Sequence, residues 1–253
     1  MFKLMKYELR RNLTTLIILY ATILGLEVYA LYGMLTKNET HTAISFTLLV
    51  FGVFAVIMFI FVIAIQSYSK ELGSKYSYMT FMTPNTTYSI IGSKLLSTGL
   101  IALTTTILAV LLVVVDFNIF INQFADVKEA KEAFEQILTS RGYDLGNIFA
   151  SVLVYFIVLW LGIFTWICVA YFAITLSATA FSNKKFRGVI SFIIFIVIAV
   201  AITRLSNLFP TVDIGSGMLN KLLSPLLSYI FDIIAMICAF WGSSILLEKK
   251  VSL

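Results

Sequence analysis

The sequence of 253 residues has little charge and few of the residue types that carry catalysis or bind metals. Charged residues make up 12% of the chain, which is about half their share in a typical soluble domain. The chain has one histidine, His41, and two cysteines, Cys168 and Cys238, which both lie inside apolar runs. A single histidine cannot build a zinc site, and the two cysteines are not spaced as metal ligands and need no disulfide. The sequence therefore predicts no metal site.

The chain also lacks a phosphate-binding loop. The pattern G-x-x-x-x-G-K-[ST] does not occur, and Gly92-Ser93-Lys94 is too short a match to hold phosphate groups. The stretch DIGSGM, from Asp213 to Met218, resembles the glycine motif around a catalytic serine, but no histidine follows it that could act as the base. We therefore assign no catalytic residue and no cofactor to this chain, and we predict that it is not an enzyme.

Hydrophobic residues, by contrast, make up 60% of the sequence. A helix needs about 20 predominantly apolar residues to cross a bilayer, and six stretches approach or exceed that length. They predict an all-α, polytopic membrane protein with six transmembrane helices. The predicted spans are Leu13 to Met34, Thr42 to Gln66, Leu95 to Phe120, Asn147 to Ser177, Gly188 to Phe209, and Leu222 to Leu247.

Basic residues are distributed unequally between the segments that join these spans. If both termini lie inside, the inner segments hold twelve of the 18 lysine and arginine residues, and the outer segments hold the remaining six. Cytoplasmic segments carry the excess of basic residues in multi-pass membrane proteins, so we predict that both termini are cytoplasmic. The net charge of +5 then reflects topology and does not indicate a nucleic-acid partner. The heavy use of Ile, Phe, Lys and Asn is typical of a low-GC bacterium, and the predicted location is the bacterial cell (plasma) membrane.

Three segments outside the spans have recognisable patterns. Residues 1–12 combine apolar residues at helical spacing with basic residues, which predicts an interfacial helix that contacts membrane lipids. A plain charged flank that sets topology is the alternative. Residues 121–146 predict an amphipathic helix in an outer loop, as a lid or a plain connector. Residues 204–221 are interrupted by proline and glycine and predict an outer re-entrant segment.

Residues 67–94 form a long polar stretch on the predicted inner side. Five of its residues recur at the spacing of one helix face: Tyr68, Leu72, Tyr76, Met79 and Met82. Pro84 ends this predicted helix. A hairpin between two spans needs only a few residues, so the length indicates either a surface that docks a partner or an interfacial anchor.

The same stretch resembles part of a known family. Glu71-Leu72-Gly73 contains an acidic residue followed by glycine, and Ile90-Ile91-Gly92-Ser93-Lys94 is a glycine-x-lysine entry into the third span, with a proline between the two. This loop, the basic amphipathic N-terminus, the six spans and the broken segment before the last span together resemble the permease subunit of ABC-2-type ABC transporters. The outer loop is longer here than in the leanest members of that family.

The resemblance implies transport driven by ATP on another chain. In that family the loop after the second span is a cytoplasmic coupling helix, which docks in a cleft of an ABC ATPase subunit. The matching contact residues here are Glu71, Leu72, Lys75, Tyr76 and Tyr78. ATP and Mg would bind to the partner ATPase, and a second permease copy or a paralogue would complete the pathway. We expect export of a hydrophobic or amphipathic cargo, such as a peptide toxin, an antimicrobial peptide, a lipid or a drug.

Three acidic residues lie inside the apolar runs: Glu27, Asp116 and Asp232. Burying a charge in hydrocarbon costs on the order of several kcal/mol, so such residues usually face a cavity or a partner. Arg204 is the basic residue nearest to Asp232 in depth, and we take all four as pathway candidates. Two compatible interpretations are an ion pair with Arg204 beside interfacial acids, and an acidic outer vestibule that attracts a cationic or amphipathic cargo.

Two other functions stay open. An ATP-independent secondary carrier would be favoured by inverted repeats with interrupted helices in both halves, whereas here only the segment before the last span is interrupted. A membrane scaffold or sensor that transports nothing would use the inner stretch to bind some other protein.

Overall fold

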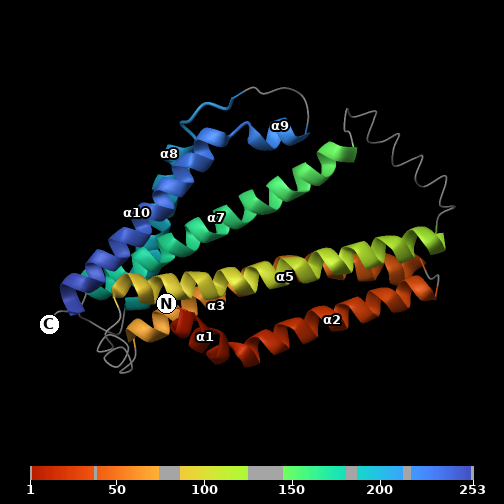
Figure 1. Ribbon diagram of the computed structural model, residues 1–253, viewed down its shortest axis with the longest axis horizontal. Coiled ribbons are helices and arrows are strands. Elements are labelled where there is room, and N and C mark those ends of the chain that lie inside the picture. Colours follow the sequence, from red (N-terminus) through yellow and green to blue (C-terminus); the bar gives the residue numbers. More distant parts are fainter. Residues whose placement is uncertain are drawn as a thin grey trace. The chain divides into compact units, whose positions relative to one another are not determined.

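The computed structural model describes residues 2–36, 39–73, 86–124, 145–180, 187–212 and 218–251. Every regular element in these residues is a helix, so the all-α prediction is confirmed (Figure 1). The helices are α1 (Phe2–Arg11), α2 (Leu13–Leu35), α3 (Glu39–Gly73), α5 (Thr87–Phe124), α7 (Leu145–Ala180), α8 (Arg187–Ser206), α9 (Met218–Leu223) and α10 (Leu226–Val251).

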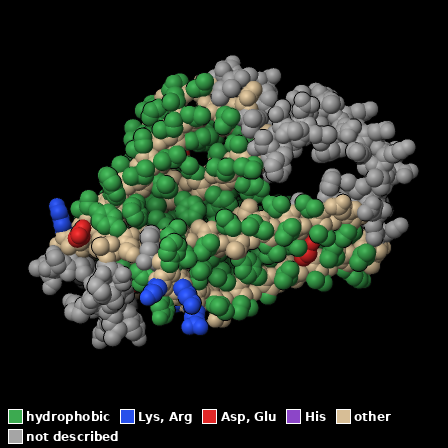
Figure 2. Space-filling model, in the orientation of Figure 1, with side chains coloured by type: hydrophobic (Ala, Val, Ile, Leu, Met, Phe, Trp, Pro, Cys, Tyr) green, Lys and Arg blue, Asp and Glu red, His purple; other side chains and the backbone are tan. Residues whose placement is uncertain are grey.

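Six of these helices are long and apolar enough to cross a membrane. The candidate spans are Leu13–Leu35, Thr47–Leu72, Thr87–Asp116, Leu153–Thr179, Gly188–Ser206 and Leu226–Lys249. Hydrophobic side chains cover most of the described helix surface on the face in Figure 2, and large ones such as Phe51 and Trp241 are 66% and 60% exposed. So much exposed apolar surface is unfavourable in water and suits contact with lipid. The chain is therefore an all-α, multi-pass membrane protein.

If each of the six candidate spans crosses the membrane once, the chain begins and ends on the same side. The same count predicts that the connections from α3 to α5 and from α7 to α8 are on that side and that the other three are on the opposite side. The cytoplasmic location of both termini stays a prediction.

Two helices continue well beyond their predicted spans. α3 runs on to Gly73 instead of ending at Gln66, and α5 begins at Thr87 instead of Leu95. Residues 67–72 contain neither glycine nor proline, so nothing in them interrupts the helical hydrogen bonds. The ends of the predicted inner stretch 67–94 are therefore helical turns continuous with α3 and α5. Its middle, residues 74–85, lies outside the described residues, as does most of the predicted outer loop 121–146.

The segment before the last span contains the short helix α9. The amide N of Val212 donates to the carbonyl O of Ser224 at 2.8 Å, and the hydroxyl of Tyr229 donates to the carbonyl O of Leu222 at 3.0 Å. The carbonyl O of Pro225 accepts the amide of Tyr229 at 3.1 Å, so α10 begins directly after this proline, where its missing N–H removes no helical bond. The last span therefore begins later than Leu222, which lies in α9.

The helices form two units. One comprises Ile63–Leu95 and Gly142–Leu253, and the other comprises Phe2–Val62 and Leu96–Arg141. We refer to them as unit 1 and unit 2. Unit 1 thus contains the end of α3, the start of α5 and all of α7 to α10, whereas unit 2 contains α1, α2, most of α3 and the rest of α5.

In unit 1, α7 packs against α8, α9 and α10. A buried cluster of Cys168, Val169 and Ala239 joins α7 to α10. Gly242 lets the two helices approach closely, because a Cβ at this position would lie 2.7 Å from Cε2 of Phe172. Small residues at such contacts are typical of helix pairs in membranes. The α8 side chains packed against the cluster are Phe195, Ile198 and Ile202.

In unit 2, two contacts hold α2 against its neighbours. The hydroxyl of Tyr20 lies 2.9 Å from Oγ1 of Thr104 and 3.3 Å from Oγ1 of Thr105, which joins α2 to α5. A Cβ on Gly52 would lie 2.8 Å from Cδ1 of Leu26, which shows a close approach of α2 and α3. These contacts bring together residues that are far apart in the sequence.

The N-terminal helix α1 has a mixed surface. Phe2 is 76% exposed, whereas Glu8 is 9% exposed and forms an ion pair with Arg11 at 2.6 Å. The predicted range 1–12 and the observed helix agree closely. Its placement on a lipid surface stays a prediction.

Candidate functional site

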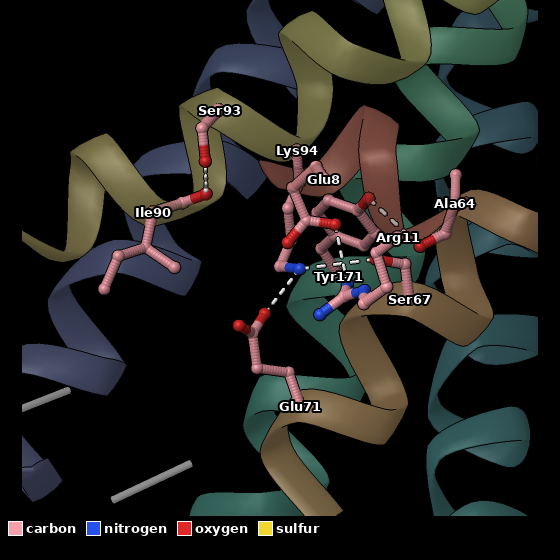
Figure 3. A network of polar contacts seen from close by, with 9 residues as sticks. All are labelled: Glu8, Arg11, Ala64, Ser67, Glu71, Ile90, Ser93, Lys94 and Tyr171. Atoms are coloured by element: carbon pink, nitrogen blue, oxygen red, sulfur yellow. Dashed lines mark hydrogen bonds and ion pairs between the residues drawn. The ribbon is translucent and has the colours of Figure 1, made fainter. Parts of the chain in front are cut away.

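A buried lysine lies near the start of α5. Lys94 is 2% exposed, and its Nζ forms an ion pair with the carboxylate of Glu71 on the last turn of α3. The same nitrogen donates to Oγ of Ser67 at 3.3 Å. Figure 3 shows Glu71 and Ser67 pointing from α3 toward Lys94. The pair therefore joins the two helix ends that flank residues 74–85.

The spacing of Ser67 and Glu71 explains this arrangement. Residues four apart lie on the same face of a helix, so both side chains reach one point, which Lys94 occupies. A buried charge is tolerated only when it is paired and hydrogen-bonded. Removing Glu71 would leave the Lys94 ammonium without its ion-pair partner, which makes the pair a strong constraint on how α3 and α5 meet.

One turn before Glu71, two tyrosines link α3 to α7. The rings of Tyr68 and Tyr171 stack with centroids 4.2 Å apart and an interplanar angle of 22°. The hydroxyl of Tyr68 lies 2.5 Å from Oγ1 of Thr175. The hydroxyl of Tyr171 donates to the carbonyl O of Ala64 at 3.2 Å, as Figure 3 shows. Each tyrosine thus bonds to the helix that carries the other.

We refer to Ser67, Tyr68, Glu71, Lys94, Tyr171 and Thr175 as the base network. It lies entirely in unit 1, and both tyrosines are at most 2% exposed. A buried polar network whose members are satisfied holds its helices in one arrangement. The base network therefore fixes α3, α5 and α7 to one another near the end of α3 and the start of α5.

The structure places two of the five residues predicted to contact an ATPase. Glu71 belongs to the base network, with its side chain 11% exposed, and Leu72 follows it, half-buried, near the end of α3. The other three, Lys75, Tyr76 and Tyr78, lie outside the described residues. The role of all five in docking stays a prediction.

Two of the predicted pathway residues come together in unit 2. Glu27 on α2 and Asp116 on α5 are 4% and 5% exposed, and their carboxyl groups lie close enough to interact with each other. Both residues were predicted as pathway candidates, but they were not predicted to be neighbours.

The other two pathway residues do not form the expected ion pair. Arg204 is exposed near the end of α8, and Asp232 is half-buried on α10. The ion pairs between described residues do not include one that joins Arg204 to Asp232. The expectation relied on their similar depth alone, and depth does not determine which face of a helix a side chain occupies.

The sequence did not indicate most of the base network. Lys94 was noted only as part of the entry into the third span, and Tyr171 and Thr175 were ordinary members of the fourth. The available signal was a lysine next to an apolar run together with an acidic residue at the end of the preceding run.

Comparisons with protein-family models, with curated proteins and with solved structures find no match to this chain.

Proposed function

We propose that this chain is the permease subunit of an ATP-driven ABC exporter of the ABC-2 type. It forms the pathway for a hydrophobic or amphipathic cargo with a second copy or a paralogue, and it couples to a separate cytoplasmic ATPase that binds ATP and Mg. The surface that docks the ATPase is the segment between α3 and α5, with Leu72 and Tyr76 among its contacts.

The base network is the observation that carries this proposal. A segment that passes the motion of a cytoplasmic partner to the membrane needs a rigid attachment at both of its ends. The pair of Glu71 and Lys94 joins those ends, and the stacked pair of Tyr68 and Tyr171 joins them to α7. A partner that pulls on the segment therefore acts on three membrane helices together. A loose connector would require none of these buried polar contacts.

An ATP-independent carrier is the second candidate, and the contact between Glu27 and Asp116 favours it. Buried acidic residues in spans often line ion pathways and proton relays. Such a carrier needs no ATPase partner, so the two candidates differ in what co-purifies with the chain.

Co-purification tests the proposal. The tagged chain is extracted from its native membrane in a mild detergent, and the proteins that accompany it are identified by mass spectrometry. We expect a stoichiometric soluble protein with a phosphate-binding loop. Leu72→Asp and Tyr76→Asp should each release it, because a charge on a docking face must be desolvated.

Val212→Asp is the matched control. It adds the same charge to an exposed apolar residue in a connection on the opposite side of the membrane, and it should retain the partner. If no such protein accompanies the wild-type chain, under conditions that preserve a known membrane complex, the exporter proposal fails and the carrier is favoured.

A further inference from the structure

The contact between Glu27 and Asp116 in unit 2 has an unusual chemical character. Glu27 and Asp116 are each at least nine-tenths buried. Both carboxyl oxygens of Glu27, and Oδ1 of Asp116, are inaccessible and accept no hydrogen bond from any described residue. Buried carboxylates normally accept hydrogen bonds or pair with a cation. The described residues therefore offer these two buried carboxyl groups no hydrogen-bond donor.

The described parts of the neighbouring helices do not supply an opposite charge. From Leu13 to Leu35, α2 has Glu27 and three tyrosines as its only ionisable residues, and α5 from Leu96 to Phe124 has only Asp116. α3 has no ionisable residue from Thr42 to Val62. In the part of α3 that belongs to unit 2, the described side chains include one ionisable group, His41. The ring of His41 interacts with Tyr29 and Tyr32. The basic residues of α1 precede Leu13, and Glu27 follows Leu13 by fourteen residues, or about 20 Å of helix.

The chemistry of two adjacent carboxyl groups indicates which ligand would satisfy them. Ionised carboxylates are acceptors only, so a hydrogen bond between them requires a proton on one of the two. When two carboxylates share a site, repulsion and burial both favour proton uptake. A metal ion would need more ligands, and the described residues contain no group of three or more His, Cys, Asp or Glu side chains that could hold one.

We propose that Glu27 and Asp116 form a proton-binding site, in which a proton is shared between the two carboxyl groups. While the site stays closed to water, the pair keeps at least one proton. A conformation that admits water stabilises both ionised carboxylates and releases the proton. Proton binding is thereby linked to the access of water to the site. The proposal requires no ATPase partner, so it stands or falls independently of the exporter function.

Infrared spectroscopy tests the site in the wild-type chain without any substitution. The full chain, reconstituted in lipid, is prepared with isotope-labelled aspartate in one sample and labelled glutamate in another. At neutral pH we expect a carbonyl stretch of a protonated carboxylic acid that responds to labelling and to exchange into heavy water. A spectrum in which both acid types are fully ionised at neutral pH would overturn the proposal.

Conservative variants then assign the band. Glu27→Gln and Asp116→Asn preserve the approximate side-chain volume, and the double variant should lose the band. Each single variant should shift the signal of the remaining acid, because its hydrogen-bond partner has changed. Glu8→Gln is the matched control, since Glu8 is ion-paired with Arg11 and should contribute nothing to the band. A band that survives the double variant, or single variants that leave the other signal unshifted, would refute sharing.

Thermal unfolding gives a second readout. A proton that binds the folded site more tightly than the unfolded chain stabilises the fold, so the Tm should rise as pH falls from mildly alkaline to mildly acidic. The double variant should lose this part of the pH dependence. The comparison is repeated in His41→Gln, which removes the one histidine of the sequence. A pH dependence that is the same with and without the two carboxyl groups would contradict the proposal.

Discussion

Tyr68 and Tyr171 stack on each other while each hydroxyl bonds to the helix that carries the other ring. The Tyr68 hydroxyl reaches Thr175 on α7, and the Tyr171 hydroxyl reaches the backbone of Ala64 on α3. The two bonds are separated by stacked rings whose centroids lie 4.2 Å apart. α3 and α7 cannot slide or rotate past each other without breaking both bonds and the stack, so this contact acts as a clamp between the two helices.

Tyr68→Phe should lower the free energy of unfolding by about 1 kcal/mol, because it keeps the ring but removes a buried hydrogen bond. Tyr171→Phe should have a similar effect, since it leaves the Ala64 carbonyl without that donor. Denaturation of the reconstituted protein measures both. Tyr155→Phe is the control, because Tyr155 lies on α7 but is 50% exposed. Equal stability of all three variants and the wild type would show that the clamp contributes nothing.

Glu71→Gln should destabilise the protein by about 3–5 kcal/mol, because it removes the ion-pair partner of a buried ammonium group. Replacing both members, as in Glu71→Leu with Lys94→Met, should cost much less than the two single changes added together. Unfolding measurements on the wild type, Glu71→Leu, Lys94→Met and the double variant give the coupling free energy of the two side chains directly. Lys70→Gln serves as the control, since this neighbouring lysine is exposed. Additive effects of the two single changes would exclude a functioning ion pair.

Gly242→Ala should destabilise unit 1 by about 1–3 kcal/mol through overpacking. The added Cβ would lie 2.7 Å from Cε2 and 3.1 Å from Cδ2 of Phe172, which must shift. Gly162→Ala makes the same change on α7, where nothing lies within 4 Å of the new Cβ, and should stabilise the helix by up to about 1 kcal/mol. The opposite sign of the two effects, measured by thermal unfolding, is the diagnostic result. A neutral Gly242→Ala would show that α7 and α10 are not closely packed there.

Cysteine labelling tests the crossing pattern. In a chain whose two native cysteines have been replaced, Val212→Cys and Thr86→Cys place single thiols in exposed positions on opposite sides of the six-span arrangement. If both termini are cytoplasmic, an impermeant thiol reagent added to whole cells should modify the cysteine at position 212 and leave that at position 86 unmodified until the cells are opened. The reverse pattern would invert the orientation, and equal labelling in intact cells would refute the arrangement of spans.

Much of the fold could be predicted from the sequence because hydrophobic length alone identifies membrane helices. The six observed spans overlap the six predicted ones, and the main differences lie at helix ends. Ser67 to Leu72 are polar enough to be taken for a loop, yet they continue α3. Local composition does not show where helical hydrogen bonding stops when neither glycine nor proline intervenes.

The functional sites were less predictable, because they depend on which helices are neighbours and which faces they present. Glu71 and Lys94 were both recognised as parts of the inner stretch, but their pairing depends on how α3 and α5 meet. Glu27 and Asp116 were recognised by their apolar surroundings, and their contact follows only once α2 is known to lie against α5. The same reasoning led to a wrong expectation for Arg204 and Asp232, since similar depth does not imply a shared face.

ATP hydrolysis in reconstituted membranes tests the central claim most directly. The co-purified protein with a phosphate-binding loop is assayed in liposomes with and without this chain. The exporter account predicts that hydrolysis is faster with the wild-type chain, returns to the rate of the ATPase alone with Tyr76→Asp, and stays fast with Val212→Asp. An ATPase rate that is the same with and without the chain would contradict coupling through the segment between α3 and α5.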